Sequence, residues 1–174
     1  RQPDTDVFRL WEVAGTAHAD RFLLGPLADS TPCITPVNAA PLHVVAKAAL
    51  RHLDTWIRDG VAPPEAARLA TTGEPPDIVR DADGIALGGI RTPPVDVPVD
   101  VLSGVTGPNP DLYCILLGST TPLSDARLAE LYASPADYLQ RYDAATDAAI
   151  GAGFVLEEDR ATVRAHAEPS RIPG

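Results

Sequence analysis

The pattern of hydrophobic and polar positions along this chain predicts a mixture of helices and strands. Its clearest period lies between Pro41 and Asp59, where apolar residues recur at helical spacing. This apolar stripe consists of Leu42, Val45, Ala46, Ala49, Leu50, Leu53, Trp56 and Ile57. Pro41 suits the first turn of a helix, and Gly60 supplies its end. We expect this helix to bury its whole stripe against the core.

A different pattern occupies residues 7–13, where both sets of alternating positions are mostly apolar. Phe8 and Leu10 share one face, whereas Trp11 and Val13 share the other. Apolar residues on both faces are typical of a strand inside a sheet that is covered on both sides. We therefore expect a buried strand over residues 7–13.

The small residues Gly15, Thr16 and Ala17 follow this predicted strand and do not favour its continuation. The chain is therefore expected to turn just before His18. A histidine at the end of a buried strand is typical of an acid–base group in α/β enzymes. His18 is thus the first candidate catalytic residue.

The rest of the chain is rich in turn-forming residues, with 18 prolines and 13 glycines. Such a composition favours ordered connections over long regular elements. The remaining pattern predicts an irregular loop over 19–40, a connection over 61–76, a hairpin over 77–88 with its turn at 82–84, an extended edge segment over 95–101, helices over 125–132 and 135–150 capped by Ser124 and Ser134, and a short charged helix over 157–167.

Several segments, taken in order, carry a family resemblance. They are RLWEVAGTAHAD at 9–20, CITPVN at 33–38, PLHVV at 41–45, LDTWIRDG at 53–60, GGIRTP at 88–93, LGSTTP at 117–122 and AGFVL at 152–156. Together they resemble the α/β-hydrolases, and most closely the bacterial branch described as alpha/beta hydrolase domain proteins. The resemblance implies an α/β fold. Residues 1–60 would form the C-terminal end of the hydrolase core, with its last strand and helix, and residues 61–174 an additional mixed elaboration.

The same resemblance implies that His18 is the histidine of a catalytic triad, which takes a proton from a serine hydroxyl and returns it to the leaving alcohol. A hydrolase of this kind carries its nucleophile in a G-x-S-x-G elbow upstream of the histidine. The sequence has no such elbow, since Ser103 and Ser119 each adjoin glycine without completing the motif. We expect this chain to be the C-terminal portion of a longer enzyme. The nucleophile and acid would lie on missing sequence or a second polypeptide, and the chain alone would be inactive and poorly stable.

Other candidate residues favour structural roles. Glu12 and Asp20 are the acids nearest to His18, but both are expected to shape the loop rather than complete a triad. His43 is expected to hydrogen-bond the loop that carries Asn38. Two further histidines, His52 and His166, are predicted to be exposed on helices, and Trp11 and Trp56 to belong to the core.

Composition limits the possible partners. The net charge of −10 argues against nucleic acids and anionic membranes, which both require basic surface. No apolar run reaches the roughly 20 residues that span a bilayer. The predominance of arginine and alanine, with Lys47 the one lysine, indicates a GC-rich bacterial genome. Cys33 and Cys114 form a disulfide if the protein is exported, or Cys114 is a small core residue, so the compartment remains open.

No cofactor or metal is expected. Asp81, Asp83 and Gly84 lack the spacing of a calcium loop, and Gly88-Gly89 lacks the lysine of a phosphate-binding loop. The sequence therefore favours a serine hydrolase acting on a small-molecule carboxylic ester. Two alternatives stay open: an amidase or lactonase with the same triad, and a non-catalytic binding module that retains the end of the hydrolase fold.

Overall fold

The computed structural model describes residues 1–107 and 111–174. Its helices and strands are α1 (Arg21–Leu24), α2 (Leu42–Asp59), β1 (Thr71–Thr72), β2 (Asp77–Ile78), α3 (Pro93–Asp96), β3 (Asp100–Ser103), β4 (Ser119–Pro122), α4 (Asp125–Leu131), α5 (Pro135–Gly151) and α6 (Arg160–Arg164). Short 3₁₀ helices cover Gly25–Ser30, Cys114–Leu116, Glu157–Asp159 and Pro169–Arg171.

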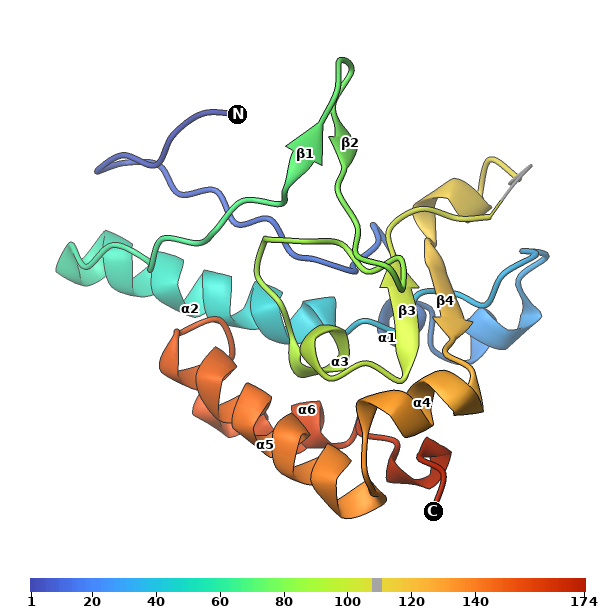
Figure 1. Cartoon of the computed structure of the whole chain (residues 1–174). Coiled ribbons are helices and arrows are strands. Elements are labelled where there is room, and N and C mark those ends of the chain that lie inside the picture. Colours follow the sequence, from blue (N-terminus) through green and yellow to red (C-terminus); the bar gives the residue numbers. More distant parts are fainter. Residues whose placement is uncertain (108–110) are drawn as a thin grey trace.

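The long helix α2 runs through the middle of the molecule (Figure 1). The extended N-terminal segment lies along one side of α2, and α5 and α6 lie on the other. The pair β3–β4 stands near the start of α2, and the hairpin β1–β2 projects away from the body of the protein. The architecture is thus consistent with part of an α/β fold, with helices and small antiparallel sheets.

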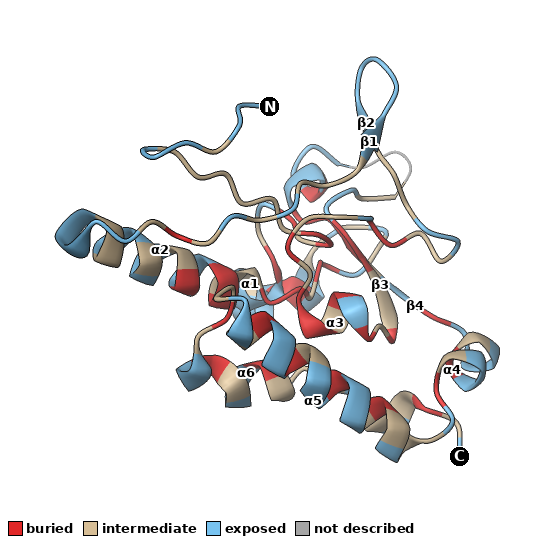
Figure 2. Cartoon of the chain, turned by 60° about the vertical axis from the view of Figure 1, so that its left-hand side comes forward, coloured by how far each residue is buried: buried red, intermediate tan, exposed pale blue. Residues whose placement is uncertain are grey.

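The helix predicted from the clearest period is confirmed. It covers Leu42–Asp59 and ends at Gly60, whose left-handed backbone (φ 71°) favours glycine. Its apolar stripe, however, is buried only in its first half. Val45 is 2% exposed, whereas Leu50 and Ile57 are 67% and 76% exposed. Figure 2 shows this change along α2, from buried at its start to exposed at its far end. The expectation that the whole stripe is buried is wrong for this chain.

The strands differ from the predicted ones because side-chain alternation alone does not supply a pairing partner. A hairpin was predicted over residues 77–88, but the observed hairpin β1–β2 begins earlier, within the predicted connection 61–76. The predicted turn at 82–84 is closed by a single bridge between Arg80 and Ala86. Part of the segment 95–101, predicted to be extended, belongs to the short helix α3. β3 starts at Asp100 and pairs antiparallel with β4, with Ser103 opposite Ser119.

The predicted helices near the C-terminus are confirmed with their caps. Ser124 accepts a hydrogen bond from the backbone N–H of Arg127 at the start of α4. Ser134 accepts one from Asp137 at the start of α5. Each cap satisfies one of the free N–H groups of a helix start. The predicted terminal helix is shorter than expected and consists of a 3₁₀ turn followed by α6.

Residues 7–13 form extended backbone rather than the predicted strand. In the described part of the chain, two isolated bridges involve this segment. Phe8 pairs with the nearby Thr5, and Val13 pairs in parallel with the distant Ile90, with hydrogen bonds from Ala14 N to Ile90 O (2.9 Å) and from Ile90 N to Glu12 O (2.7 Å). The side chains in this segment are half-buried, apart from Val7, which is exposed. A strand needs neighbouring strands along its length, and among the described residues the bridge to Ile90 is the only one from a distant segment.

The main core joins side chains of α4, α5 and α6 to Val44 and Val45 at the start of α2. Its largest side chains are Leu128, Tyr132, Tyr138 and Tyr142, which are nearly or completely buried. Residues before and after position 60 share this core, and the division of the chain into 1–60 and 61–174 stays a prediction. No helix in the described ranges combines the length and the apolar character that crossing a bilayer requires.

Candidate functional site

The loop over residues 14–20 is fixed by backbone contacts on both sides of His18. On one side Gly15 adopts a left-handed backbone (φ 71°), and a Cβ there would lie 2.9 Å from the Val95 side chain. Glycine is therefore required at this close approach. On the other side the N–H of Ala19 donates to Leu116 O at 2.9 Å. The backbone of His18 is thus held while its side chain stays accessible.

The imidazole of His18 is exposed and lies in a bend. Within residues 1–107 and 111–174, no hydrogen bond or ion pair engages it. An exposed ring on an anchored backbone is available to a substrate or to groups from another polypeptide. The chemistry open to an imidazole in this position is general acid–base catalysis.

Asn38 is the buried residue that ties this loop to the sheet. Its Nδ2 donates to the carbonyls of Gly15 (2.7 Å), Ser103 (3.0 Å) and Ser119 (3.4 Å), and its Oδ1 accepts from Ala40 N. One carboxamide therefore joins the His18 loop to both β3 and β4. This role was not predictable from the sequence, because an asparagine between prolines is also typical of an ordinary turn.

The two acids nearest to His18 in sequence have other partners. Asp20 accepts a hydrogen bond from Leu23 N at 2.9 Å and caps α1, inside the segment predicted to be an irregular loop. Glu12 accepts from Leu69 N at 2.8 Å and pairs with Arg1. These contacts agree with the interpretation that both acids shape the local structure.

The serines beside glycines are likewise engaged in the fold. Ser119 Oγ donates to Val105 O at 2.7 Å, and Ser103 Oγ accepts from Val105 N at 3.1 Å. Both serines are buried at the end of the β3–β4 pair. The described residues therefore place no activated serine beside His18.

A cavity of about 250 Å³ opens next to this loop. Thr16, two residues before His18, lines it together with Ser103 and Gly104 at the end of β3. Leu69 and Ile78 form apolar walls, and Arg80 contributes the guanidinium group. The cavity is large enough for a small organic group and combines apolar walls with hydrogen-bond donors.

The disulfide between Cys33 and Cys114 is formed, which settles the alternative that the sequence left open. It joins positions 81 residues apart and anchors the 3₁₀ turn Cys114–Leu116. Leu116 is the residue whose carbonyl accepts the hydrogen bond from Ala19 N. The bridge therefore supports the loop that carries His18.

His43 does not form the hydrogen bond predicted for it. Its ring stacks on Phe22 with centroids 3.7 Å apart, and neither of its buried nitrogens has a partner in the described part of the chain. Burial lowers the pKa of His43. The carboxylate of Asp20 opposes that shift, the nearby His166 adds to it, and the carboxylate of Asp159 opposes it.

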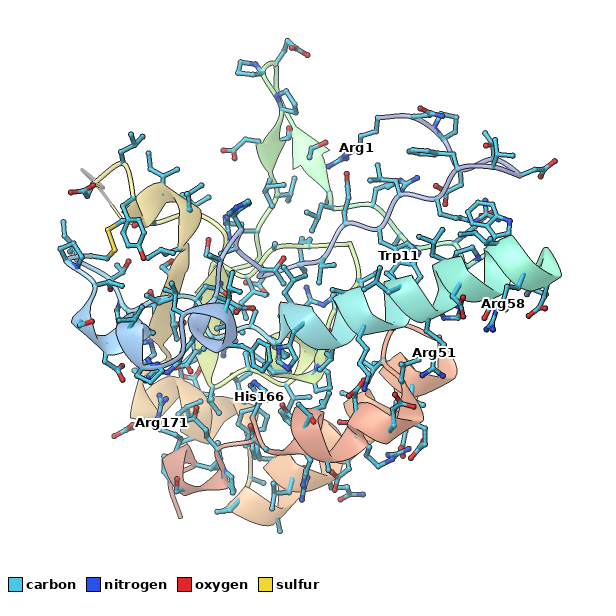
Figure 3. The ribbon with its side chains drawn as sticks, turned by 180° about the vertical axis from the view of Figure 1, so that it is seen from behind. Arg1, Trp11, Arg51, Arg58, His166 and Arg171 are labelled. Atoms are coloured by element: carbon cyan, nitrogen blue, oxygen red, sulfur yellow. A yellow bond between two sulfur atoms is a disulfide. The ribbon has the colours of Figure 1, made fainter. Side chains whose placement is uncertain are left out.

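His52 and His166 are half-buried rather than exposed. His52 Nε2 lies 2.8 Å from Gly153 O, and His166 Nδ1 lies 2.9 Å from Thr162 O, so each ring is bound to a backbone carbonyl. Figure 3 labels His166 near the start of α2. Both rings were predicted to be solvated because helical spacing does not reveal the neighbours brought by a later segment.

Trp11 lies between the N-terminal segment and α2 (Figure 3). Trp11 Nε1 donates to Pro64 O at 2.9 Å, and its ring meets Phe154 edge-on. Trp56 is half-buried beneath the guanidinium of Arg9. Trp11 thus packs against the core as predicted, whereas Trp56 lies at its margin.

In the described ranges, no group of three or more His, Cys, Asp or Glu side chains lies close enough together to hold a metal ion.

Comparison with known protein families shows that a family model described as alpha/beta hydrolase domain matches residues 1–165. Neither the curated proteins nor the solved structures gave a match.

Proposed function

The chain belongs to the alpha/beta hydrolase domain family, and from this premise we propose that it supplies the catalytic histidine, His18, of a serine hydrolase. The observation that carries the proposal is the state of His18. Its side chain is exposed, and its backbone is held on both sides by Asn38 and by the bond from Ala19 to Leu116. A general base needs this combination of access and fixed position.

The nucleophile and the acid of the triad come, in this proposal, from outside these 174 residues. Support comes from the absence of a G-x-S-x-G elbow in the sequence and from the structural contacts that engage Ser103 and Ser119. In the assembled enzyme one nitrogen of His18 would bond to the serine Oγ and the other to the carboxylate. The serine needs the base, and the imidazole needs the carboxylate to fix its tautomer.

The polypeptide that brings these groups would also cover the exposed apolar surface on the N-terminal side of the molecule. Val7 is 88% exposed, and Leu50 and Ile57 on α2 are exposed as well. Surfaces of this kind mark contacts with other protein segments. This chain alone would therefore be inactive and of low stability.

Carboxylic esters are the proposed substrates by analogy with the wider fold, in which ester hydrolysis is common. The surroundings of His18 are compatible with such substrates, since Phe22, Leu23 and Leu116 expose apolar side chains on the neighbouring turns. The same triad could also hydrolyse amides or lactones. Measuring turnover of esters, amides and lactones distinguishes these three activities.

The test is the replacement of His18 by alanine in the intact enzyme. Turnover should fall by about 10³–10⁶-fold, the range for loss of a triad member. Labelling of the serine by an organophosphate should fall with it, because the same base activates that serine. Folding should change little, since the side chain is exposed.

His43→Ala is the matched control, since it removes a nearby imidazole and should affect stability more than turnover. Loss of turnover in folded His43→Ala, with His18→Ala near normal, would contradict the assignment.

The exposed half of α2 favours the second candidate function, a non-catalytic binding module. An intact protein without a labelled serine, and without an elbow in any of its chains, would favour that module.

A further inference from the structure

Arg80 differs from every other basic side chain in how its charge is balanced. The sequence has 14 lysine and arginine residues, and all of them lie in the described part of the chain. Thirteen of these side chains form an ion pair with Asp or Glu within 4.0 Å, and Arg80 is the exception. In a chain with 24 acidic residues, a half-buried arginine without a carboxylate is unexpected.

The position of Arg80 is as informative as its lack of a carboxylate partner. Its side chain lines the cavity of about 250 Å³ that also includes Thr16 of the His18 loop. One of its nitrogens, Nη1, donates to Gly84 O at 3.0 Å, which fixes the side chain across the turn. The hydrogen bonds found for the guanidinium in the described residues use only that nitrogen, so Nε and Nη2 remain available to a ligand.

The acid beside Arg80 in sequence does not neutralise it. Asp81 Oδ1 accepts hydrogen bonds from Asp83 N (3.0 Å) and Ile85 N (2.9 Å) and so belongs to its own turn. Asp83 in turn is bound by the guanidinium of Arg127. Neither of these carboxylates forms an ion pair with Arg80, whose side chain lines the cavity.

Ser103 supplies a second donor to the same cavity. Its Oγ accepts a hydrogen bond from Val105 N, and within residues 1–107 and 111–174 its own hydroxyl hydrogen has no acceptor. The serine side chain is buried, and an unmade hydrogen bond there costs free energy. A guanidinium with two free nitrogens and a hydroxyl without an acceptor line one cavity, and together they suit an anionic oxygen group.

We propose that the cavity that Thr16 of the His18 loop helps to line binds a carboxylate, held by Arg80 with Ser103 as a second donor. The planar fork of an arginine matches a carboxylate in geometry as well as charge. Resting on the proposed function, the inference names the substrate class: small esters that carry a carboxylate in addition to the ester bond. The apolar walls at Leu69 and Ile78 would hold the short carbon chain between the two groups.

Binding to the intact protein tests the carboxylate site without any need for turnover. Butyrate, neutral butyramide and inorganic phosphate are titrated by calorimetry. Butyrate should bind, and its affinity should fall at least about tenfold in Arg80→Gln, the scale of a lost charge-assisted hydrogen bond. Arg80→Lys keeps the charge and should bind with intermediate affinity.

Arg58→Gln is the matched control, because Arg58 lies exposed on α2 and is paired with Asp54. It should bind butyrate like the unaltered protein. Equal binding of butyrate and butyramide, or unchanged binding in Arg80→Gln, overturns the proposal. Tighter binding of phosphate than of butyrate would replace the carboxylate by a phosphate group and would also overturn it. If Arg80→Gln does not fold, Arg80→Lys and the comparison of the three ligands decide.

Turnover provides the second measurement, with monoethyl succinate as the anionic ester and ethyl pentanoate as the neutral one. Arg80→Gln should raise KM for the anionic ester at least about tenfold and leave the neutral ester unchanged. The two proposals fail separately. If His18→Ala keeps full activity while butyrate still requires Arg80, only the catalytic assignment falls. If turnover requires His18 but the KM of neither ester changes in Arg80→Gln, only the carboxylate site is refuted.

Discussion

At the scale of the residue, the four histidines show how much the environment decides. His18 is exposed on an anchored loop, whereas His52 and His166 are bound to backbone carbonyls. His43 has both ring nitrogens buried, with no partner for either among the described residues. A residue type with one intrinsic chemistry therefore has a potential catalytic role at one position and packing roles at others.

His43 should make the stability of the protein depend on pH. Burial places its pKa below the ordinary value of 6.5. The unfolded state therefore binds the proton more readily, and the free energy of unfolding should fall as the pH drops below about 6.5. The free energy of unfolding, measured with denaturant at pH 7.5 and pH 5, should fall less between these two pH values in His43→Phe than in the unaltered protein. The phenylalanine keeps the ring stacked on Phe22.

His18→Ala is the control for this measurement, because the exposed ring of His18 has no buried nitrogen to protonate. That variant should show the same pH dependence as the unaltered protein. An equally steep loss of stability in His43→Phe would show that other groups cause it.

At the scale of the element, α2 separates what a periodic pattern predicts from what packing achieves. The apolar spacing specified the helix and its end at Gly60. Burial then depended on which segments lie against each turn, and α5 and α6 cover only the first part. The exposed second part has the composition of an interface and no cover from this chain.

Two leucines on helices should therefore respond differently to truncation. Leu128→Ala in α4 removes a completely buried side chain and should cost about 2–5 kcal/mol of unfolding free energy. Leu50→Ala in α2 removes an exposed side chain and should change that free energy by about 0.5 kcal/mol or less. Urea unfolding of this chain measures both. A loss above 1 kcal/mol for Leu50→Ala would mean that the exposed half of α2 is covered in solution.

At the scale of the whole molecule, the disulfide and Asn38 hold together segments that are distant in sequence. Cys33 and Cys114 join the region after α1 to the turn before β4, and Asn38 joins the His18 loop to both strands. These links hold the His18 loop in place, although in the described ranges only the two-stranded sheet β3–β4 lies beside it.

Reduction of the disulfide should destabilise the protein by about 2–4 kcal/mol, because a bridge across 81 residues restricts the unfolded chain strongly. Urea unfolding with and without a reductant gives this difference. The double variant Cys33→Ser/Cys114→Ser should show the reduced stability in both conditions. A protein whose midpoint is unchanged by reduction would contradict the prediction.

Sequence alone determined the features that depend on local chemistry. The stripe and Gly60 specified α2, and Ser124 and Ser134 specified the starts of α4 and α5, because caps and helical periods act over a few residues. The turn before His18 was also predictable, since Gly15 is required by its backbone. These are interactions that the chain makes with its own neighbours in sequence.

Only the tertiary structure decided the features that need a distant partner. Residues 7–13 have the apolar pattern of a buried strand, but the described residues supply no neighbouring strand, so this segment makes only isolated bridges. The roles of Asn38 and the isolation of Arg80 both depend on which segments, remote in sequence, lie within reach. A hydrogen bond or ion pair has a range of a few ångströms, and only the fold sets which groups come that close.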